Sequence, residues 1–95
     1  MHDMLTLKNL KISETAAMKR LDRALVKKHQ QVRRFRAGSA EAKQYGRFYI
    51  VDTEAEQIIA TADEITPWMK TENVIKDYEF VEGEGKPGYE NRSLT

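Results

Sequence analysis

The first part of the chain has apolar positions spaced as in a helix. On a period of about 3.6 residues, one face collects the apolar residues Ala17, Met18, Leu21, Ala24 and Leu25. Ser13 suits an N-cap, Glu14 suits the positive end of a helix dipole, and residues 16–29 contain no Gly or Pro. This pattern predicts a helix from residue 14 to about residue 29. Its opposite face is basic and carries Lys19, Arg20, Arg23 and Lys27.

The middle of the chain changes to a strand-like pattern. Residues 31–36 read as an extended segment without an assigned partner, in which Val32 and Phe35 fall on opposite faces and indicate a bulge or a late helix end. Residues 47–52 carry apolar side chains on both faces, as a central strand does, with Phe48 and Ile50 opposed to Tyr49 and Val51. Residues 57–61 are β-branched and follow a polar turn, which predicts an antiparallel hairpin with residues 47–52.

A loop and a second helix are expected on either side of this hairpin. The loop covers about ten residues over 37–46 and is expected to be mobile, because turn-forming residues gather there: Gly38, Ser39 and Gly46. The pair Thr66-Pro67 is a helix start, since Pro is tolerated at the first helical position. A short helix carrying Trp68 and Met69 is therefore predicted.

The two ends of the chain carry weaker patterns. Residues 1–12 are compatible with a short strand or an extended arm. Residues 78–81 are predicted to form a last edge strand, and the chain after Glu82 has too little apolar content to pack. We expect one domain over residues 1–82 and a disordered tail over residues 83–95.

Composition limits the class of protein. A chain of 95 residues allows one domain with a modest core, and 40% hydrophobic with 33% charged residues is typical of a soluble domain with a charged surface. No apolar run reaches the roughly 20 residues that span a bilayer, and no secretory segment follows Met1, so we expect a cytoplasmic protein without membrane contact. Without cysteine, stability depends on packing or self-association, which favours a homo-oligomer.

The net charge of +1 conceals a strong polarity along the chain. Residues 1–48 hold 12 Lys and Arg against 4 Asp and Glu, whereas residues 49–95 hold 4 against 11. Such asymmetry fits an anion-binding half beside an acidic half. It fits equally two halves that neutralise each other within the fold or across a dimer.

Candidate catalytic groups are few. The two histidines, His2 and His29, are expected to be surface residues. Carboxylates alternate near a turn without the glycine spacing of a calcium loop, and form a solvated acidic edge rather than a metal site: Asp52, Glu54 and Glu56. The sequence has no phosphate-binding glycine loop, dinucleotide fingerprint or nucleophile elbow. We expect no enzyme, cofactor or metal, although an enzymatic alternative would need a carboxylate pocket around Asp52 and Asp63.

The basic stretch is the strongest functional signal. Residues 19–36 contain eight cations and a single acid, Asp22. Phosphate neutralisation drives nucleic-acid affinity, and Arg adds bidentate geometry and base stacking. DNA or RNA is the predicted partner, bound by Lys19, Arg20, Arg23, Lys27, Arg33, Arg34, Arg36 and Arg47. A solvated or self-neutralising surface and an acidic protein partner remain alternatives. Three aromatic residues are expected to be core or interface anchors rather than stacking residues: Phe35, Tyr49 and Trp68.

Three short segments carry a resemblance: RFR at 34–36, YGRFYIVD at 45–52 and IIA at 58–60. Over about residues 32–70 the chain resembles small uncharacterised proteins of bacteria and their phages, which have a basic N-terminal helix, an R-x-R segment and a strand-turn-strand pattern. The resemblance implies a hairpin-and-helix α+β domain from a mobile element, where small proteins often block or recruit a host complex. It transfers no site residue.

These observations together predict a single α+β domain. A basic amphipathic helix packs on a small antiparallel sheet, with a second short helix at Pro67. The predicted function is a non-enzymatic binding module whose helix and arginine face binds nucleic-acid phosphates, as a homodimer. The alternative is a protein-interaction or inhibitor protein of a phage or mobile element that acts through its charged faces.

Overall fold

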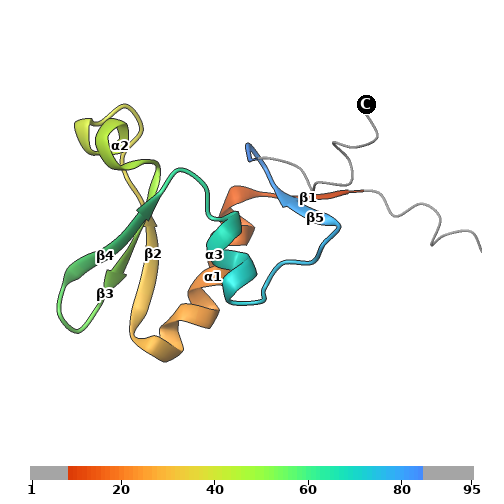
Figure 1. The fold of residues 1–95 in the computed structure, drawn as a ribbon, viewed down its shortest axis with the longest axis horizontal. Coiled ribbons are helices and arrows are strands. Elements are labelled where there is room, and N and C mark those ends of the chain that lie inside the picture. Colours follow the sequence, from red (N-terminus) through yellow and green to blue (C-terminus); the bar gives the residue numbers. More distant parts are fainter. Residues whose placement is uncertain (1–8, 85–95) are drawn as a thin grey trace, which may run out of the picture.

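The fold combines a three-stranded antiparallel sheet with helices on one side. The structure is a computed structural model that describes residues 9–84. In chain order its elements are β1 (Leu10–Ile12), α1 (Glu14–Leu25), the 3-10 turn η2 (Val26–Lys28), β2 (Gln30–Arg34), α2 (Ala40–Tyr45), β3 (Phe48–Asp52), β4 (Gln57–Ala62), α3 (Thr66–Thr71) and β5 (Glu79–Val81). β2, β3 and β4 form the sheet with β3 in the centre, whereas β1 and β5 form a separate parallel pair. Figure 1 shows α1 and α3 on one side of the sheet, and the β1–β5 pair beyond them. The predicted α+β class is confirmed.

α1 begins and ends as its sequence indicates. The side-chain oxygen of Ser13 accepts a hydrogen bond from the backbone N–H of Ala16 at 3.1 Å, which caps the first turn. The helix tightens into η2 after Leu25 and ends at His29, whose φ of 60° is left-handed and turns the chain into β2. The predicted helix over residues 14–29 is therefore confirmed, with a 3-10 last turn.

The sheet register places side chains as the alternation predicts. Val32 pairs with Ile50, and Ile50 pairs with Ala60, on the face that meets the helices. The hairpin of β3 and β4 is confirmed, with β3 central as predicted, and a register shift at Ile50 leaves Ile59 outside the pairing. β2 pairs with β3 without a shift, so the bulge or late helix end indicated for residues 31–36 is wrong. Val32 and Phe35 fall on opposite faces because the strand simply alternates.

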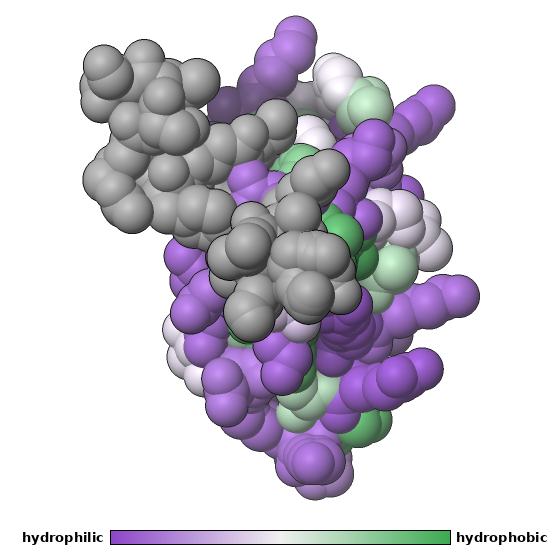
Figure 2. Space-filling view, turned by 90° about the vertical axis from the view of Figure 1, so that its right-hand side faces the viewer, coloured by the Kyte–Doolittle hydropathy of each residue, from purple (hydrophilic) through white to green (hydrophobic). Residues whose placement is uncertain are grey.

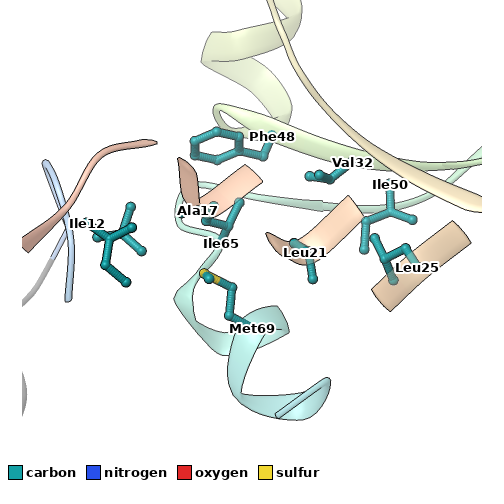
Figure 3. Close-up of a cluster of buried hydrophobic side chains, with 10 residues drawn as sticks. Ile12, Ala17, Leu21, Leu25, Val32, Phe48, Ile50, Ile65 and Met69 are labelled. Atoms are coloured by element: carbon teal, nitrogen blue, oxygen red, sulfur yellow. The ribbon is translucent and has the colours of Figure 1, made fainter. Parts of the chain in front are cut away.

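One core lies between the sheet and the two helices. Figure 3 shows Val32, Phe48 and Ile50 of the sheet facing Ala17, Leu21 and Leu25 of α1, with Ile65 and Met69 beside them. Phe48, Leu21, Leu25, Ile65 and Met69 are fully buried. Burying side chains of this size contributes roughly 1.5–3 kcal/mol each relative to leaving them in water. The apolar face predicted for the first helix is therefore the face that packs.

The residues at both ends of the described range form the parallel pair. Ile12 lies opposite Val81, and the N–H of Leu10 donates to the carbonyl oxygen of Tyr78 at 2.7 Å. The strand expected at residues 78–81 is confirmed as β5, and of the two options for residues 1–12 the strand is correct for Leu10–Ile12. The rest of that segment, residues 1–8, lies outside the described residues.

The segment between β2 and β3 differs from the prediction. Residues 37–46 were expected to be a loop, but Ala40–Tyr45 form α2. Ser39 caps this helix by accepting from the N–H of Ala42 at 3.0 Å, and Gly46 ends it. Between this cap and Gly46 lie residues that favour helix, such as Ala and Gln, which explains why the segment folds.

The boundary of the expected tail also shifts. Glu84 is 8% exposed, and its carboxylate accepts from the N–H groups of Ile65 and Thr66, both at 3.0 Å. The Thr66 hydroxyl donates to the same carboxylate at 2.5 Å. Glu84 is therefore part of the fold and was placed wrongly in the tail. The remaining residues 85–95, expected to be disordered, lie outside the described residues.

Candidate nucleic-acid interface

The basic residues predicted to bind nucleic acid do not form one surface. Three of them, Lys19 and Arg23 of α1 and Lys27 of η2, are exposed at a spacing of four residues. This spacing makes one row that points away from the buried Ala17, Leu21 and Leu25. None of the three has an ion-pair partner among residues 9–84. We call Lys19, Arg23 and Lys27 the helix row. Figure 2, which views the molecule from the side of the β1–β5 pair, shows mainly hydrophilic side chains with small hydrophobic areas between them.

A second group lies on the far side of the sheet. In the pairing of β2 with β3, Arg33 lies opposite Tyr49. Each is the direct neighbour of a residue that faces the core, Val32 in β2 and Ile50 in β3. Arg33 and Tyr49 therefore point away from α1 and α3, on what we call the outer face. Arg33 is exposed and donates to the side-chain oxygen of Gln31 at 2.8 Å on the same face. The sheet thus separates Arg33 from the helix row.

Three aromatic rings follow one another along this outer face. The ring of Phe35 lies 4.4 Å from that of Tyr49 and 6.2 Å from that of Tyr45, with interplanar angles of 37° and 29°. Tyr45 is 48% exposed, and Phe35 and Tyr49 are half-buried. We call Tyr45, Phe35 and Tyr49 the aromatic strip. Exposed Arg36 follows Phe35 directly in the chain.

Arg34 and Arg47 are held by an internal carboxylate. Each forms an ion pair with Glu14, one to each carboxylate oxygen, and the Glu14 side chain is 15% exposed. The Arg47 guanidinium also lies 4.9 Å from the centroid of the Phe48 ring, within the range of a cation–π contact. These three charged residues line a groove of about 550 Å³ together with Phe35 and Gly38. Arg34 and Arg47 are therefore partly neutralised.

Arg20 is also paired, in this case with the acidic half of the chain. Its guanidinium donates two hydrogen bonds to Glu79, at 2.8 and 3.1 Å. The hydrogen bonds from Arg20 lower the pKa of Glu79 and raise that of Arg20. A second pair joins Lys28 to Glu72 at 2.6 Å. The charge polarity of the chain is therefore relieved in part by contacts between its two halves.

The predicted site residues consequently fall into three groups. The helix row lies on one side, Arg33 lies on the outer face with exposed Arg36 beyond the end of β2, and Arg20, Arg34 and Arg47 are engaged in ion pairs. The predicted interface residues also separate, because Phe35 and Tyr49 touch each other whereas Trp68 packs against the core. No sequence pattern predicted Glu14 as a bridge between Arg34 and Arg47, because these three residues meet only in the fold.

The carboxylates considered for an enzymatic site do not gather. Asp52 lies at the turn end of the hairpin, where one of its oxygens accepts from the N–H groups of Glu54 and Ala55 at 2.9 and 3.0 Å. Asp63 follows Ala62, which pairs with Phe48 at the opposite end. Among residues 9–84 no group of three His, Cys, Asp or Glu side chains is close enough to hold a metal ion. The Nδ1 atom of His29 lies 3.8 Å from the Oε2 atom of Glu54 at the surface. His2 lies outside the described residues.

Comparison of the chain with family models, curated proteins and solved structures finds no match. The resemblance to small bacterial and phage proteins therefore stays a prediction. Over the described range, the longest helix is the 12-residue α1, and no helix is long and apolar enough to cross a membrane.

Proposed function

We propose that the protein is a small cytoplasmic, non-enzymatic module that binds DNA or RNA through the outer face of its sheet. Arg33 on this face and exposed Arg36, which follows Phe35 beyond the end of β2, supply the cations, and the aromatic strip supplies flat apolar surface. The observation that carries the proposal is the chemistry of this face. Arginine and exposed aromatic rings together are the combination that binds phosphates and bases.

The distribution of acidic residues supports the same face. Glu79 and Glu72 pair with Arg20 and Lys28, on the side of the molecule that carries the helices. Within the described residues Arg33 and Arg36 form no ion pair with a carboxylate, although the charge of Arg33 acts on the carboxyl group of Asp22, so both guanidinium groups can bind an anion. The helix row is available too, but within residues 9–84 none of its cations makes a cation–π contact with an aromatic ring. We therefore assign it a secondary, purely electrostatic contact with phosphates.

Two matched double variants test this assignment. Arg33→Ala with Arg36→Ala removes the outer-face charge of Arg33 and the exposed charge that follows Phe35, and Lys19→Ala with Lys27→Ala removes two charges from the helix row. Each phosphate contact contributes about 0.7–0.9 to the slope of log affinity against log salt. The arginine variant should therefore lower that slope by about 1.5, and the lysine variant should lower it less. Titration of labelled oligonucleotides at several salt concentrations gives both slopes. An arginine variant with unchanged affinity and slope would contradict the proposal, and equal losses in both variants would mean that net charge alone drives binding.

The edge of β4 favours a second candidate function, protein interaction. In the described residues β4 has one neighbour, β3, so its other edge is open. Ile58 and Ile59 on this strand are 52% and 49% exposed. Exposed apolar edge strands pair with other chains. A homodimer through β4, or an inhibitor of phage or mobile-element origin that pairs with a host protein, would use this edge. The helix row would suit an acidic protein partner.

Capture from a cell lysate separates the two candidates. The protein is immobilised and the lysate is applied with and without nuclease treatment. If the nucleic-acid proposal holds, the bound material disappears with nuclease and with the Arg33→Ala, Arg36→Ala variant. A protein that stays bound after nuclease and is lost with Ile58→Lys would support the second candidate instead.

A further inference from the structure

We infer that the outer face binds single-stranded nucleic acid, with unpaired bases lying against the aromatic strip, in preference to a duplex. This inference rests on the proposed function and names its substrate class. The evidence for it is that the rings of Tyr45, Phe35 and Tyr49 follow one another and that Tyr49 is the cross-strand neighbour of Arg33. α1 and α3 lie on the other side of the sheet and leave this face open (Figure 1).

The geometry of the strip leaves ring surface available at both of its ends. Phe35 lies between Tyr45 and Tyr49, so its ring contacts both neighbours. Tyr45 and Tyr49 each have one neighbouring ring in the strip, and Tyr45 is 48% exposed. A base that stacks on an exposed tyrosine removes apolar surface of both rings from water. Stacking of this kind is tolerant of sequence, because every base has a flat π-face.

The surroundings of the strip select against a duplex. Bases within a duplex are covered above and below by their neighbours, so their faces cannot reach a protein ring without unpairing. The outer face is part of a sheet, and α1, the longest described helix, lies on the other side of that sheet. A duplex could therefore contact the outer face through its phosphates alone, whereas a single strand gains both phosphate and stacking contacts.

Arg33 lies beside the rings that such a strand would contact. Arg33 is the cross-strand neighbour of Tyr49, and Arg36 follows Phe35 in the chain. Phosphates alternate with bases along a strand, so cations beside the rings can pair with phosphates while the bases stack. Arg34 and Arg47 border the same end of the face but are engaged by Glu14. The aromatic strip with Arg33 and Arg36 is thus the minimal site.

The test compares one strand with its own duplex. Fluorescently labelled DNA and RNA oligomers of mixed sequence and about 12 nucleotides are used, a length within the site sizes of small single-strand binders. Fluorescence anisotropy is measured for each strand alone and annealed to its complement at the same salt. The wild-type protein should bind the single strand about tenfold more tightly, because stacking of one base contributes enough for such a factor.

Aromatic variants show whether stacking causes the preference. Tyr45→Leu keeps apolar bulk at an exposed helix position, and should weaken single-strand binding by about fivefold while leaving duplex binding unchanged. Because no charge is lost, the salt slope should not change, in contrast to the arginine variants. Tyr78→Leu is the matched control, since Tyr78 is 36% exposed and lies next to β5. Circular dichroism melts confirm that the variants fold, and Tyr49→Leu is scored only if it melts like the wild type.

The outcomes separate this inference from the proposed function. Equal affinity for strand and duplex, or a Tyr45→Leu variant that loses no single-strand affinity, would overturn the inference and leave nucleic-acid binding standing. Absence of binding to either form would overturn both. A loss with Tyr78→Leu as large as with Tyr45→Leu would also overturn it, because aromatic loss at a remote position would then have the same effect.

Discussion

Gly46 shows how a single residue couples α2 to the sheet. It has a φ of 110°, and a Cβ placed on it would lie 2.7 Å from the backbone carbon and oxygen of Ala62. Two backbones therefore meet where no side chain fits. Gly46→Ala should lower the free energy of unfolding by at least about 2 kcal/mol, from the strained φ and the contact together. Urea unfolding measures the change.

The matched control for this prediction is Gly38→Ala. Gly38 also has a positive φ, 77°, but a Cβ there meets nothing within 4 Å. Gly38→Ala should lower the free energy of unfolding by about 1 kcal/mol, because of the backbone conformation alone. Equal costs at the two positions would mean that the close approach to Ala62 is not what requires Gly46. The sequence marks both glycines as turn residues and cannot distinguish them, because the approach of Ala62 arises only once β4 has paired with β3.

The N-terminus of α3 depends on a residue far along the chain. Ile65, at its N-cap position, provides no side-chain hydrogen bond, and Glu84 accepts from the N–H groups of Ile65 and Thr66 instead. Glu84→Ala leaves these donors without their partner and should cost about 2 kcal/mol of unfolding free energy. Glu84→Gln keeps an acceptor oxygen and should cost about half as much. Amide hydrogen exchange at Ile65 and Thr66 should accelerate in the Ala variant before the rest of the fold is affected.

Glu64→Ala serves as the control at this helix, since Glu64 is exposed and lies next to Ile65 in the chain. It should change the unfolding free energy by less than about 0.5 kcal/mol. A Glu84→Ala variant as stable as Glu64→Ala would show that α3 does not need the cap.

Elements that form because of residues close together in the chain could be predicted from the sequence. Elements that form because of contacts between distant residues could not. The first helix, the β3–β4 hairpin and the start at Thr66 follow from caps, periodicity and a proline in neighbouring positions. α2 also had a local signal, Ser39 followed by helix-favouring residues, which the nearby glycines outweighed. The parallel pairing of Leu10–Ile12 with Glu79–Val81 has no local signal, because the two segments are distant in the chain and meet only through the core.

The ion pair between Arg20 of α1 and Glu79 of β5 makes stability depend on pH. Arg20 lowers the pKa of Glu79 below its ordinary value of 4.5. The unfolded chain therefore takes up the proton at a higher pH than the folded protein does. The contribution of Glu79 is complete above pH 4.5 and is lost as the pH falls through the lowered pKa of the folded protein. At neutral pH Glu79→Gln should lower stability by about 1 kcal/mol.

Melting curves of wild type and Glu79→Gln between about pH 3 and pH 7 check this dependence. Their difference in Tm should shrink as the pH falls. Asp22 acts in the opposite direction, because burial raises the pKa of its carboxyl group. Asp22 titrates in both the wild type and Glu79→Gln, however, so its effect cancels in their difference in Tm. A Tm difference that stays constant down to the lowest pH would contradict the assigned role of the pair.

At the scale of the whole molecule, the candidate site could be predicted only as a set of charges. The sequence predicted that eight arginines and lysines bind on one face, but three of them are engaged in ion pairs in the fold. The fold puts the helix row and Arg33 on opposite sides of the sheet, because α1 must turn its apolar side to the core. It also brings Glu14 between Arg34 and Arg47, and Tyr45 next to Phe35. Which charges remain free therefore follows from the three-dimensional pairing rather than from their number.

The free edge of β4 leads to a prediction about self-association and salt. The strand itself is uncharged, but acidic residues flank both of its ends, Glu54 and Glu56 on one side and Asp63 and Glu64 on the other. Antiparallel pairing of two copies through this edge brings opposite ends together, and so places acidic residues against acidic residues. Salt screens that repulsion. A β4 dimer should therefore strengthen as salt rises from about 50 to 300 mM, whereas nucleic-acid binding should weaken.

Light scattering after size-exclusion chromatography measures the dimer at both salt concentrations. Replacing Glu56 and Asp63 with Gln and Asn should raise the dimer fraction at low salt and remove its dependence on salt. Ile58→Lys should abolish the dimer, because it places a charge on the pairing edge. A dimer that weakens with salt, or survives Ile58→Lys, would have to be joined through another surface. The opposite signs of the two salt effects allow one salt series to assign the outer face and the β4 edge separately.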